Sequence, residues 1–506
     1  MDRVCLIIVP SVFLASEKVF VSLGPLKVAS SLENRDVPVS MLDLNGISNY
    51  CNVVEKFCKE TDARIFGLSI TTPQLPCALK IVNTIRNILP EAKCVAGGPH
   101  ITSTCAAYKR EVRLGIVSRA HRAFKQIAEA FDVFCSGDGE ESIMLAIQPG
   151  RKGLIDADDP DSNLFLKPYQ LNSYPFPNRK LVDLQSYKYF IDGTPATSYI
   201  SQLGCPFPCT FCNGRLSPSF RRVRTRSPEN LKEEIRQIYQ EFGYTAFMDY
   251  SDEANLYPNV IESLQYLISL QDEIGESFKL RGFIKSNLFT REQAKAFKEA
   301  GFVELCVGAE SGSDRILRNI QKKSTRDQNT RCVDLCHEFG IRCKAFCSIG
   351  HAGESENSIA ETKDWLISAA PDDFDATCVV CYGGTPYYDF AVEIPDRPGI
   401  WVYTAKETGD NLYSYEVDFG SNFSYYKGIP GNYKSLVFTD YLSSERLVEL
   451  RDDLEREVRS ALKLPYYQVT PASRFEHSMG VIDSSLVHHS QTESPMTSPP
   501  PRGEDF

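Results

Sequence analysis

Short apolar runs alternate with helical patterns over the first part of the chain. The runs lie at Val4–Val9, Val37–Leu42, Ile65–Ile70, Cys94–Ala96 and Phe131–Cys135. Segments of helical spacing separate them: Gly24–Asn34, Tyr50–Glu60, Leu75–Leu89 and a longer polar stretch, Thr104–Ala130. Five strands with intervening helices predict a doubly wound, Rossmann- or flavodoxin-like parallel sheet over residues 1–150.

Glycine and small polar residues follow three of these predicted strands, at Ser69–Pro73, Gly97–His100 and Ser136–Glu140. Ligands of such sheets bind beyond the carboxyl ends of the strands. Glycine also lets the backbone approach a bulky ligand closely. The three segments are therefore candidates for a ligand site, and ordinary turns between strand and helix are the alternative.

A second alternation of strands and helices occupies residues 196–390. It follows a segment, 151–195, whose Asp, Pro, Asn and Ser content predicts a linker. The strand candidates are Thr197–Leu203, Thr245–Asp249, Lys279–Ile284, Val303–Ala309, Ile341–Ile349 and Ala376–Cys381. Six strand–helix units predict a partial (β/α)6 TIM-like barrel, with its chemistry at the carboxyl ends of the strands.

Residues 391–466 are rich in tyrosine and predict a small α+β C-terminal region. Its helix carries an apolar stripe at Leu447, Leu450, Leu454, Val458 and Leu462. Four tyrosines are candidates for the wall of a substrate pocket or for core positions: Tyr413, Tyr415, Tyr425 and Tyr426. Residues 467–506 lack such a stripe and are expected to be disordered.

Composition and charge narrow the classes of function. The 506 residues are 42% hydrophobic and 24% charged, which is typical of a globular chain, and the net charge is −11. A net acid argues against general binding of nucleic acid or of an anionic membrane. Pro10 interrupts the first apolar run and Asp2 precedes it, so we expect a strand there rather than a signal peptide. No apolar stretch reaches the roughly 20 residues of a membrane span, and we expect a cytoplasmic protein.

Three of the 17 cysteines form a distinct motif, Cys205, Cys209 and Cys212, directly after a predicted strand. Thiolates with C-x3-C-x2-C spacing can converge on one soft metal centre from a single loop. A 4Fe-4S cluster held by three cysteines leaves one iron open. A zinc site, with a fourth ligand from elsewhere, and three unligated thiols are the alternatives. The other 14 cysteines are interpreted as structural thiols, although Cys378 and Cys381 form a C-x2-C pair.

The barrel segment resembles the radical SAM family. Phe211 is the aromatic residue that the family places just before the third cysteine, and Phe247–Asp252 is similar to its second-strand segment, with Tyr250 where a second acid is usual. Val307–Ser313 matches the fourth-strand motif closely.

Three further segments extend the resemblance in the family's order. Arg221–Glu229 looks like the arginine-rich approach to the first barrel helix. Gly350–Glu354 matches the fifth-strand motif, with Ala352 where proline is usual, and Gly384–Asp389 matches the closing turn. His351 is expected to be an ordinary loop residue.

This resemblance implies a 4Fe-4S cluster on the three cysteines, at which S-adenosylmethionine (SAM) is cleaved to a 5′-deoxyadenosyl radical. The residues that it assigns to SAM are Phe211, Asp249, Gly308, Glu310 and Ser311. Four arginines would neutralise the SAM carboxylate or cobalamin, or form a solvated basic turn: Arg221, Arg222, Arg224 and Arg226. An electron donor such as flavodoxin or ferredoxin is implied as a partner, and no catalytic residue is assigned.

The N-terminal segment resembles the cobalamin-binding domain that precedes the barrel in one branch of this family. The residues implied at cobalamin are Ser69, Thr71, Gly97, Gly98, Gly137 and Glu140. The Asp-x-His-x-x-Gly motif, which supplies a histidine to cobalt in other cobalamin proteins, is absent, and the stretch Thr104–Ala130 is unusually long for the domain.

The two resemblances together imply a cobalamin-dependent methyltransferase that acts on an unactivated carbon of an unknown substrate. A radical SAM enzyme that cyclises or rearranges its substrate, with a vestigial first domain, is the alternative enzyme. A cobalamin- or zinc-binding sensor without turnover is the alternative of another class.

Overall fold

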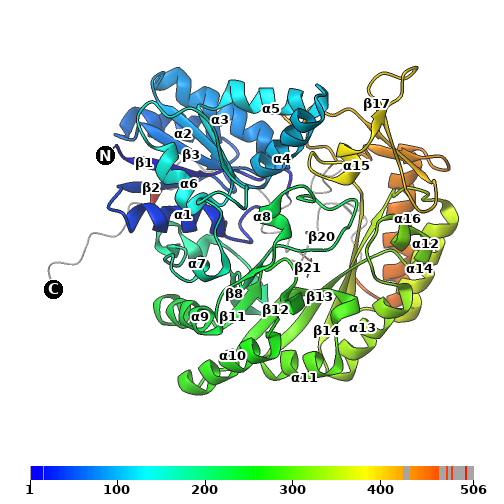
Figure 1. Cartoon of the computed structure of the whole chain (residues 1–506). Coiled ribbons are helices and arrows are strands. Elements are labelled where there is room, and N and C mark those ends of the chain that lie inside the picture. Colours follow the sequence, from blue (N-terminus) through cyan, green and yellow to red (C-terminus); the bar gives the residue numbers. More distant parts are fainter. Residues whose placement is uncertain are drawn as a thin grey trace.

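A computed structural model describes residues 2–14, 16–256, 258–425 and 433–465, together with three two-residue strands near the C-terminus. Figure 1 shows an N-terminal sheet with helices on both faces and a second, curled sheet flanked by helices, with the short helix α8 (Pro218–Arg221) between the two. The predicted α/β class, a doubly wound sheet followed by a partial barrel, is confirmed.

The N-terminal sheet contains all five strands that the apolar runs predict: β1 (Val4–Ile8), β2 (Val39–Asp43), β3 (Ile65–Ser69), β4 (Lys93–Gly97) and β5 (Val133–Gly137). They are parallel and lie in the order β2-β1-β3-β4-β5. Alternate residues of β1 enter different cores, Cys5 and Ile7 on one face and Val4, Leu6 and Ile8 on the other. A strand buried on both faces reads as an unbroken apolar run, which is why the sequence predicted these strands.

Helices cover both faces of this sheet. One face carries α1 (Leu23–Glu33) and α6 (Gly139–Ala146). The other carries α2 (Tyr50–Glu60), α3 (Leu75–Ile88), α4 (Pro99–Leu114) and α5 (Arg119–Ala130), with η1 (Thr72–Gln74) leading into α3. The long polar stretch Thr104–Ala130 thus folds as the second half of α4 and all of α5.

The predicted linker over 151–195 is wrong in its first part and in its last. A sixth parallel strand, β6 (Gly153–Ala157), pairs with β5, so the sheet continues beyond residue 150. Gly153 and Asp156 interrupt its apolar residues and it lies at an edge of the described strands β1 to β6, which explains its weak sequence signal. The middle part of the predicted linker holds α7 (Pro168–Leu171), η2 (Arg179–Leu181) and η3 (Leu184–Ser186).

At the end of the linker, β7 (Phe190–Ile191) and β8 (Thr194–Tyr199) form a hairpin. Asp192 and Gly193 both have positive φ, as a two-residue hairpin turn of the primed type requires.

The curled sheet consists of six parallel strands: β8, β11 (Ala246–Asp249), β12 (Lys279–Ile284), β13 (Phe302–Glu310), β14 (Arg342–Ile349) and β15 (Asp373–Cys378). The main helices after the first five strands are α9 (Pro228–Phe242), α10 (Val260–Ile274), α11 (Arg291–Glu299), α13 (Arg326–Glu338) and α14 (Glu356–Ala369). Shorter elements lie between them: η4 (Ala254–Leu256), η5 (Ser286–Leu288) and α12 (Asp314–Asn319). The barrel remains open, because β15 and the β7 hairpin form its two edges.

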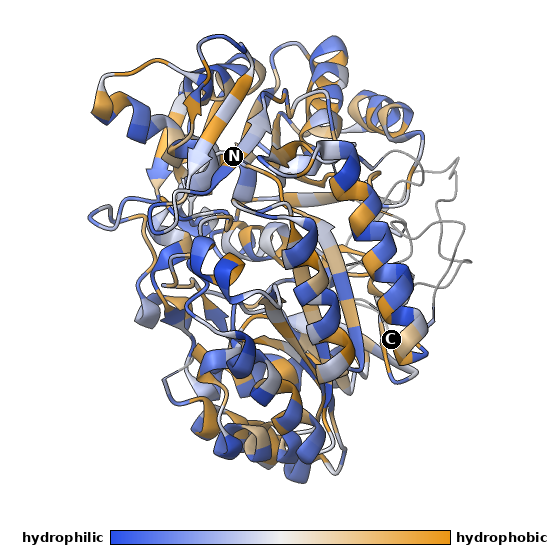
Figure 2. Ribbon diagram, turned by 90° about the vertical axis from the view of Figure 1, so that its right-hand side faces the viewer, coloured by the Kyte–Doolittle hydropathy of each residue, from blue (hydrophilic) through white to orange (hydrophobic). Residues whose placement is uncertain are grey.

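The C-terminal region divides differently from the prediction for 391–466. After α15 (Pro386–Asp389) comes an antiparallel sheet of β16 (Val392–Glu393), β17 (Ile400–Thr404), β18 (Asn411–Tyr415) and β19 (Val437–Thr439). The helix with the predicted stripe, α16 (Ser444–Leu462), instead packs on β15 as the sixth barrel helix. Its Arg451 donates to the carbonyl oxygen of Ala376 at 2.9 Å, and its Glu455 accepts from the nitrogen of Ala376 at 3.1 Å. In Figure 2 the helices mix hydrophilic and hydrophobic residues along their length, as expected for helices with one face on the core.

The predicted disordered tail, 467–506, lies outside the described residues except for β20 (Phe475–Glu476), β21 (Gly480–Val481) and β22 (Met496–Thr497), of which β22 pairs with β2. Tyr426 also lies outside the described part. None of the described helices is long and apolar enough to cross a membrane.

Candidate active site

The three-cysteine loop leaves the barrel after β9 (Gln202–Leu203), which pairs with β10 (Arg224–Thr225). Arg221 holds the loop: its guanidinium donates to the carbonyl oxygens of Phe207 at 2.8 Å and Pro206 at 2.6 Å. Gly204 has a φ of +85°, and a Cβ there would lie 2.1 Å from the carbonyl oxygen of Arg222. The loop's entry is therefore fixed by the segment that follows the cysteines.

The three thiols are electrostatic neighbours with unequal exposure. Cys209 is buried, Cys205 is half-buried, and Cys212 is the most exposed of the three. Burial, reinforced by Cys209 and Cys205, raises the pKa of the Cys212 thiol.

Within the described part of the chain, no three His, Cys, Asp or Glu side chains are arranged to bind one metal ion. A single zinc ion needs all its ligands about 2.3 Å from one centre, whereas the cysteines of a 4Fe-4S cluster bind different irons. The soft donor set of three cysteines on one loop fits such a cluster.

Lys285 provides independent support for an anionic group at this loop. Its side chain is only 2% exposed, and its ammonium lies 4.2 Å from the centre of the Phe207 ring. It donates to the carbonyl oxygen of Lys322 at 2.9 Å, but no described carboxylate lies within ion-pair distance of it. Burial and the nearby Lys322 lower the pKa of Lys285, while Cys209 and Glu253 oppose this shift. A thiolate-bound cluster or a SAM carboxylate would supply the negative charge that keeps a buried ammonium charged.

Glu310 ends β13 in a left-handed conformation, with a φ of +63°. Its carboxylate accepts from the Lys322 ammonium at 2.9 Å and from the Ser348 hydroxyl at 2.8 Å. Burial alone would raise the pKa of Glu310, but Lys322 and the hydrogen bonds outweigh it and lower the pKa. Glu310 is therefore an anion held at the carboxyl end of the barrel, beside the cysteine loop.

Other residues assigned to SAM have structural partners. A Cβ at Gly308 would lie 2.8 Å from both Glu310 Oε1 and Lys322 Nζ, so Gly308 makes room for the ion pair. The Ser311 hydroxyl accepts from the nitrogen of Ser313 at 3.1 Å and lies 3.0 Å from the Thr362 hydroxyl. Phe211 is half-buried, with its ring centre 5.3 Å from that of His351.

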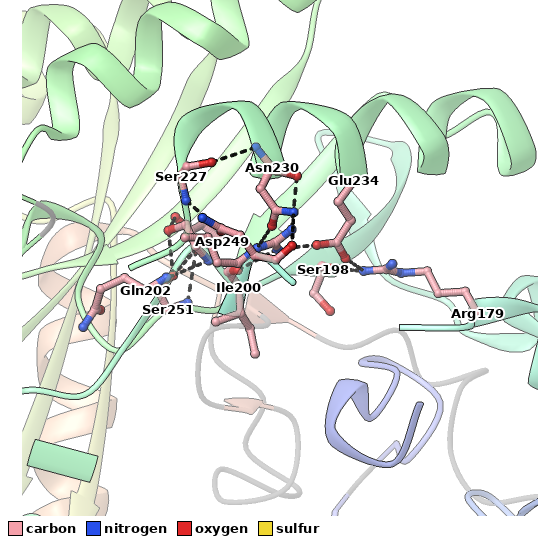
Figure 3. Close-up of polar contacts among 12 residues, drawn as sticks. Arg179, Ser198, Ile200, Gln202, Ser227, Asn230, Glu234, Asp249 and Ser251 are labelled. Carbon is pink, nitrogen blue, oxygen red and sulfur yellow. Dashed lines mark hydrogen bonds and ion pairs between the residues drawn. The ribbon is translucent and has the colours of Figure 1, made fainter. Parts of the chain in front are cut away.

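Asp249 is enclosed by hydroxyl groups (Figure 3). Its carboxylate accepts from the Ser201 hydroxyl at 2.9 Å and from both the nitrogen and the hydroxyl of Ser251. These contacts join the ends of β8 and β11. Asp249 thus organises the barrel rim, and the structure leaves it no free oxygen directed at a ligand.

Three of the four arginines have protein partners and do not form a solvated basic turn. Arg221 holds the cysteine loop, as described above. Arg224 is buried and pairs with Asp138 at 2.6 Å, while Arg226 pairs with Glu234 on α9. Arg222 is exposed, with its guanidinium 5.6 Å from the ring centre of Phe165.

Asp138, in the predicted Gly137–Glu140 segment, links the two large units through Arg224. Asp158, at the end of β6, makes a second link, because it accepts from the Ser217 hydroxyl at 2.6 Å and from the nitrogen of Ser219 at 2.9 Å. Both partners belong to the segment after the cysteines. The carboxyl edge of the first sheet is therefore fixed against segment 217–224, which also holds the cysteine loop through Arg221.

Two adjoining cavities lie along this edge. The first, of about 350 Å³, is lined from the sheet by Ser69, Gly97, Gly98, Gly137 and Glu140 and from the barrel by Ser201, Gln202 and Leu203. The second, of about 420 Å³, is lined by Thr71, Ser11, Asn45, Asn213, Tyr250 and Tyr382. All six residues predicted at cobalamin thus line one of two cavities that share Pro25, Ser69 and Pro99.

The cavity walls fit a bulky cofactor. Gly24 has no atom within 4 Å of a hypothetical Cβ, and Gly97 has only one, at 3.9 Å, so side chains there would project into the first cavity. Gly98 and Gly137 instead leave room for neighbouring backbone. A Cβ at Gly98 would lie 2.6 Å from the nitrogen of Ile70, and a Cβ at Gly137 would lie 2.5 Å from the carbonyl carbon of Ala157. Burial raises the pKa of Glu140 on this wall.

Neither cavity has a histidine among its described lining residues. His100 lies below the edge, where its ring bonds Thr72 at 3.1 Å.

Sequence reasoning missed Lys285, Lys322, Ser348 and Tyr387, and it assigned His351 to an ordinary loop. His351 is fully buried beside Glu310. Lys285 directly follows a predicted barrel strand, a position that could have marked it as functional.

The remaining cysteines are free, and most are buried. Tyr413 and Tyr415 lie on β18 against Phe438, whereas Tyr425 contacts Tyr382 on the second cavity's wall.

Comparisons with known proteins agree with this division of the chain. Residues 199–366 match the family model of the Radical SAM superfamily, and residues 12–128 match that of the B12 binding domain. An uncharacterized methyltransferase of Pyrococcus horikoshii is 25% identical over 393 residues, which cover 76% of this chain and 83% of the relative. An anaerobic magnesium-protoporphyrin IX monomethyl ester cyclase of Cereibacter sphaeroides is 22% identical, over 68% of this chain and 55% of the cyclase.

Among solved structures, the radical SAM methyltransferase TsrM of Kitasatospora setae, with cobalamin and a [4Fe-4S] cluster bound, has a similar fold. The TM-score is 0.59 at 16% identity, and the match covers 80% of this chain and 81% of TsrM.

Proposed function

We propose that this chain, a radical SAM enzyme with a B12-binding domain ahead of its barrel, is a cobalamin-dependent methyltransferase that acts on an unactivated carbon. The observation that carries the proposal is the shared wall of the first cavity. Residues of the sheet edge and of the barrel rim line it together, and the same edge is joined to the cysteine loop through Asp138 and Asp158. Two cofactor sites that must exchange a methyl group need this juxtaposition.

The residues divide into two sets. Cys205, Cys209 and Cys212 would hold the 4Fe-4S cluster, and Glu310 would receive the ribose or amino group of SAM. Lys285 would lie beside the cluster and the SAM carboxylate. When bound, the cluster and SAM supply a 5′-deoxyadenosyl radical, and cobalamin supplies a transferable methyl group.

The sheet edge would hold cobalamin. The cofactor would lie along the two adjoining cavities, where Ser11, Asn45 and Thr71 would offer hydroxyl and amide groups to its polar side chains. No histidine lines either described wall, so the cofactor would be bound without one from this edge. Phe211 and the neighbouring aromatic side chains would exclude water from the space between the two sites.

Radical formation from SAM requires an electron, and the enzyme would receive it from a partner protein. A small redox protein such as flavodoxin or ferredoxin would supply the electron. All 17 cysteines are unpaired, which is typical of a protein in the reducing cytoplasm.

The test is anaerobic reconstitution with iron, sulfide, cobalamin and a reductant, followed by mass spectrometry of the SAM-derived products. We expect 5′-deoxyadenosine and S-adenosylhomocysteine together when the substrate is present. 5′-Deoxyadenosine alone would indicate cyclisation or rearrangement and overturn methyl transfer.

The cluster has its own control. Cys209→Ala should lose bound iron, the broad visible absorbance of the cluster and all SAM cleavage. Cys336→Ala, which removes a buried thiol of α13, should retain all three. Equal iron in the two variants would contradict the assignment of the cluster to this loop.

A further inference from the structure

A continuous chain of side-chain hydrogen bonds runs from the Glu310 carboxylate to the barrel's closing turn. The Ser348 hydroxyl donates to Glu310 at 2.8 Å. The same hydroxyl oxygen lies 2.8 Å from Nε2 of His351, and Nδ1 of His351 lies 3.2 Å from the hydroxyl of Tyr387. These residues come from β13, β14, the loop after β14 and α15.

The Glu310 carboxylate is the anionic end of this chain of hydrogen bonds, and it sets the direction of each bond. Glu310 can only accept, so the Ser348 proton points to it, and the Ser348 oxygen must then accept from His351. His351 therefore carries its proton on Nε2, and its Nδ1 accepts from the Tyr387 hydroxyl. The chain has one polarity, from Tyr387 to Glu310.

The same chain contacts the cysteine loop. The ring of Phe211, between Cys209 and Cys212, lies 5.3 Å from that of His351. The backbone of Thr210 accepts from the nitrogen of Tyr387 at 3.2 Å and donates to the carbonyl oxygen of Ile320 at 2.9 Å. His351 thus lies between Glu310 and the loop, and Tyr387 bonds both His351 and the loop.

We propose that His351 and Tyr387 are positioning residues that fix the Glu310 carboxylate for SAM and align it with the cysteine loop. The proposal deepens and rests on the proposed function, in which Glu310 contacts SAM. Lys322 binds only one oxygen of Glu310, so this contact by itself would allow the carboxylate to rotate. The Ser348–His351–Tyr387 chain binds the other oxygen and sets its plane.

Complete burial supports this role. Both His351 and Tyr387 are 0% exposed, and Glu310 is 9% exposed. Burial lowers the pKa of His351 to about 4, so its ring is neutral at physiological pH, as the single-tautomer chain requires. A buried hydrogen-bond network of this kind rigidifies its members when every one has a partner.

The test compares His351→Phe, His351→Gln and Tyr387→Phe in the full-length, cluster-reconstituted protein. Binding of radiolabelled SAM is measured by equilibrium dialysis without reductant, so that no turnover is needed. His351→Phe keeps the aromatic packing on Phe211 but donates no proton, and we expect SAM to bind up to about 10-fold more weakly, the value of one buried neutral hydrogen bond. The side-chain amide of His351→Gln can replace the lost bond to the neutral Ser348 hydroxyl and should restore most of the affinity.

Iron content and melting temperature separate positioning from folding. Iron should be unchanged in all variants, and the melting temperatures of His351→Phe and His351→Gln should fall similarly although their SAM affinities differ. Tyr387→Phe, which frees Nδ1 of His351, should weaken SAM binding by a smaller factor. Wild-type affinity in His351→Phe, or equal loss of affinity in His351→Phe and His351→Gln, would overturn the proposal. A wild-type protein with full iron that binds no SAM would instead overturn the proposed function.

Discussion

At Gly308 the absence of a side chain makes room for a buried ion pair. The carboxylate of Glu310 and the ammonium of Lys322 occupy the space that a Cβ would need, each 2.8 Å from its position. The resemblance assigned Gly308 to SAM, whereas the structure gives it a role one step removed, as the residue that lets Glu310 fold back toward Lys322.

We therefore expect Gly308→Ala to displace the ion pair. Overpacking of this kind costs about 1–3 kcal/mol of unfolding free energy, and SAM affinity should fall with the loss of Glu310's orientation. Calorimetry and SAM binding measure the two effects. Gly383→Ala is the matched control, since its Cβ would make only an ordinary contact at 3.9 Å. Unchanged SAM affinity in Gly308→Ala would argue against Glu310 as a SAM contact.

Single residues also show what the sequence could not predict. Motif spacing identified Glu310 and the three cysteines, because their positions relative to strand ends carry the family's pattern. Lys322 and Tyr387 approach Glu310 only through the curvature of the barrel and the path of its closing turn. Such contacts between distant segments leave no local pattern in the sequence.

Elements with strong periodicity were predicted well, and those at edges were not. β1 to β5 are buried on both faces and appear as apolar runs. β6 is a half-buried edge strand with little apolar content, and it was taken for a linker. The stripe of α16 was predicted correctly, but its place on β15 depends on buried polar contacts, such as that of Arg451 with Ala376, which hydrophobic spacing does not report.

The helix α9 is fixed by a buried carboxylate that two arginines share. Glu234 pairs with Arg179 at 2.8 Å and with Arg226, and Arg179 also donates to the carbonyl oxygen of Ser198 at 2.8 Å (Figure 3). Burial would raise the pKa of Glu234, but the two guanidinium groups outweigh it and lower the pKa to about 2. This carboxylate joins α9 to the linker and to the arginine-rich segment.

A pKa below the ordinary value means that this pair stabilises the fold above about pH 4.5 and that its contribution is lost as the pH falls toward 2. The contribution is about 3 kcal/mol. Glu234→Gln should lower the free energy of unfolding at neutral pH, and its gap from wild type should narrow between pH 4.5 and 2. Urea denaturation at several pH values measures the gap. Glu233→Gln, on the exposed side of the same helix, should change stability by about 0.5 kcal/mol or less. A pH-independent gap for Glu234→Gln would contradict the assignment.

Across the whole molecule, α5 connects the first sheet to the C-terminal region. Arg119 is 3% exposed and donates to the carbonyl oxygen of Tyr388, with its guanidinium 3.6 Å and 4.1 Å from the ring centres of Tyr388 and Trp401. Gln126 donates to Asp418 at 3.0 Å. The unusually long stretch that forms α5 thus holds the sheet against the segment that closes the barrel.

Arg119→Ala should loosen this connection. Two desolvated cation–π contacts and a hydrogen bond are lost, and we expect a decrease of about 2–3 kcal/mol in unfolding free energy. Hydrogen exchange should become faster in α5 and α15 and stay unchanged in β1 and β3. Arg113→Ala, on the exposed surface of α4, is the control and should leave exchange unchanged. Uniform acceleration over the whole first sheet would show that Arg119 supports the domain itself rather than its connection.

The central claim is that the sheet edge and the barrel mouth form one methyl-transfer centre. It is tested most directly by supplying SAM with a deuterated methyl group to the anaerobically reconstituted protein with cobalamin, then analysing the cobalamin by mass spectrometry. The account predicts that the deuterated methyl group appears on cobalamin bound to this protein. Cobalamin that stays unlabelled while 5′-deoxyadenosine accumulates would contradict it.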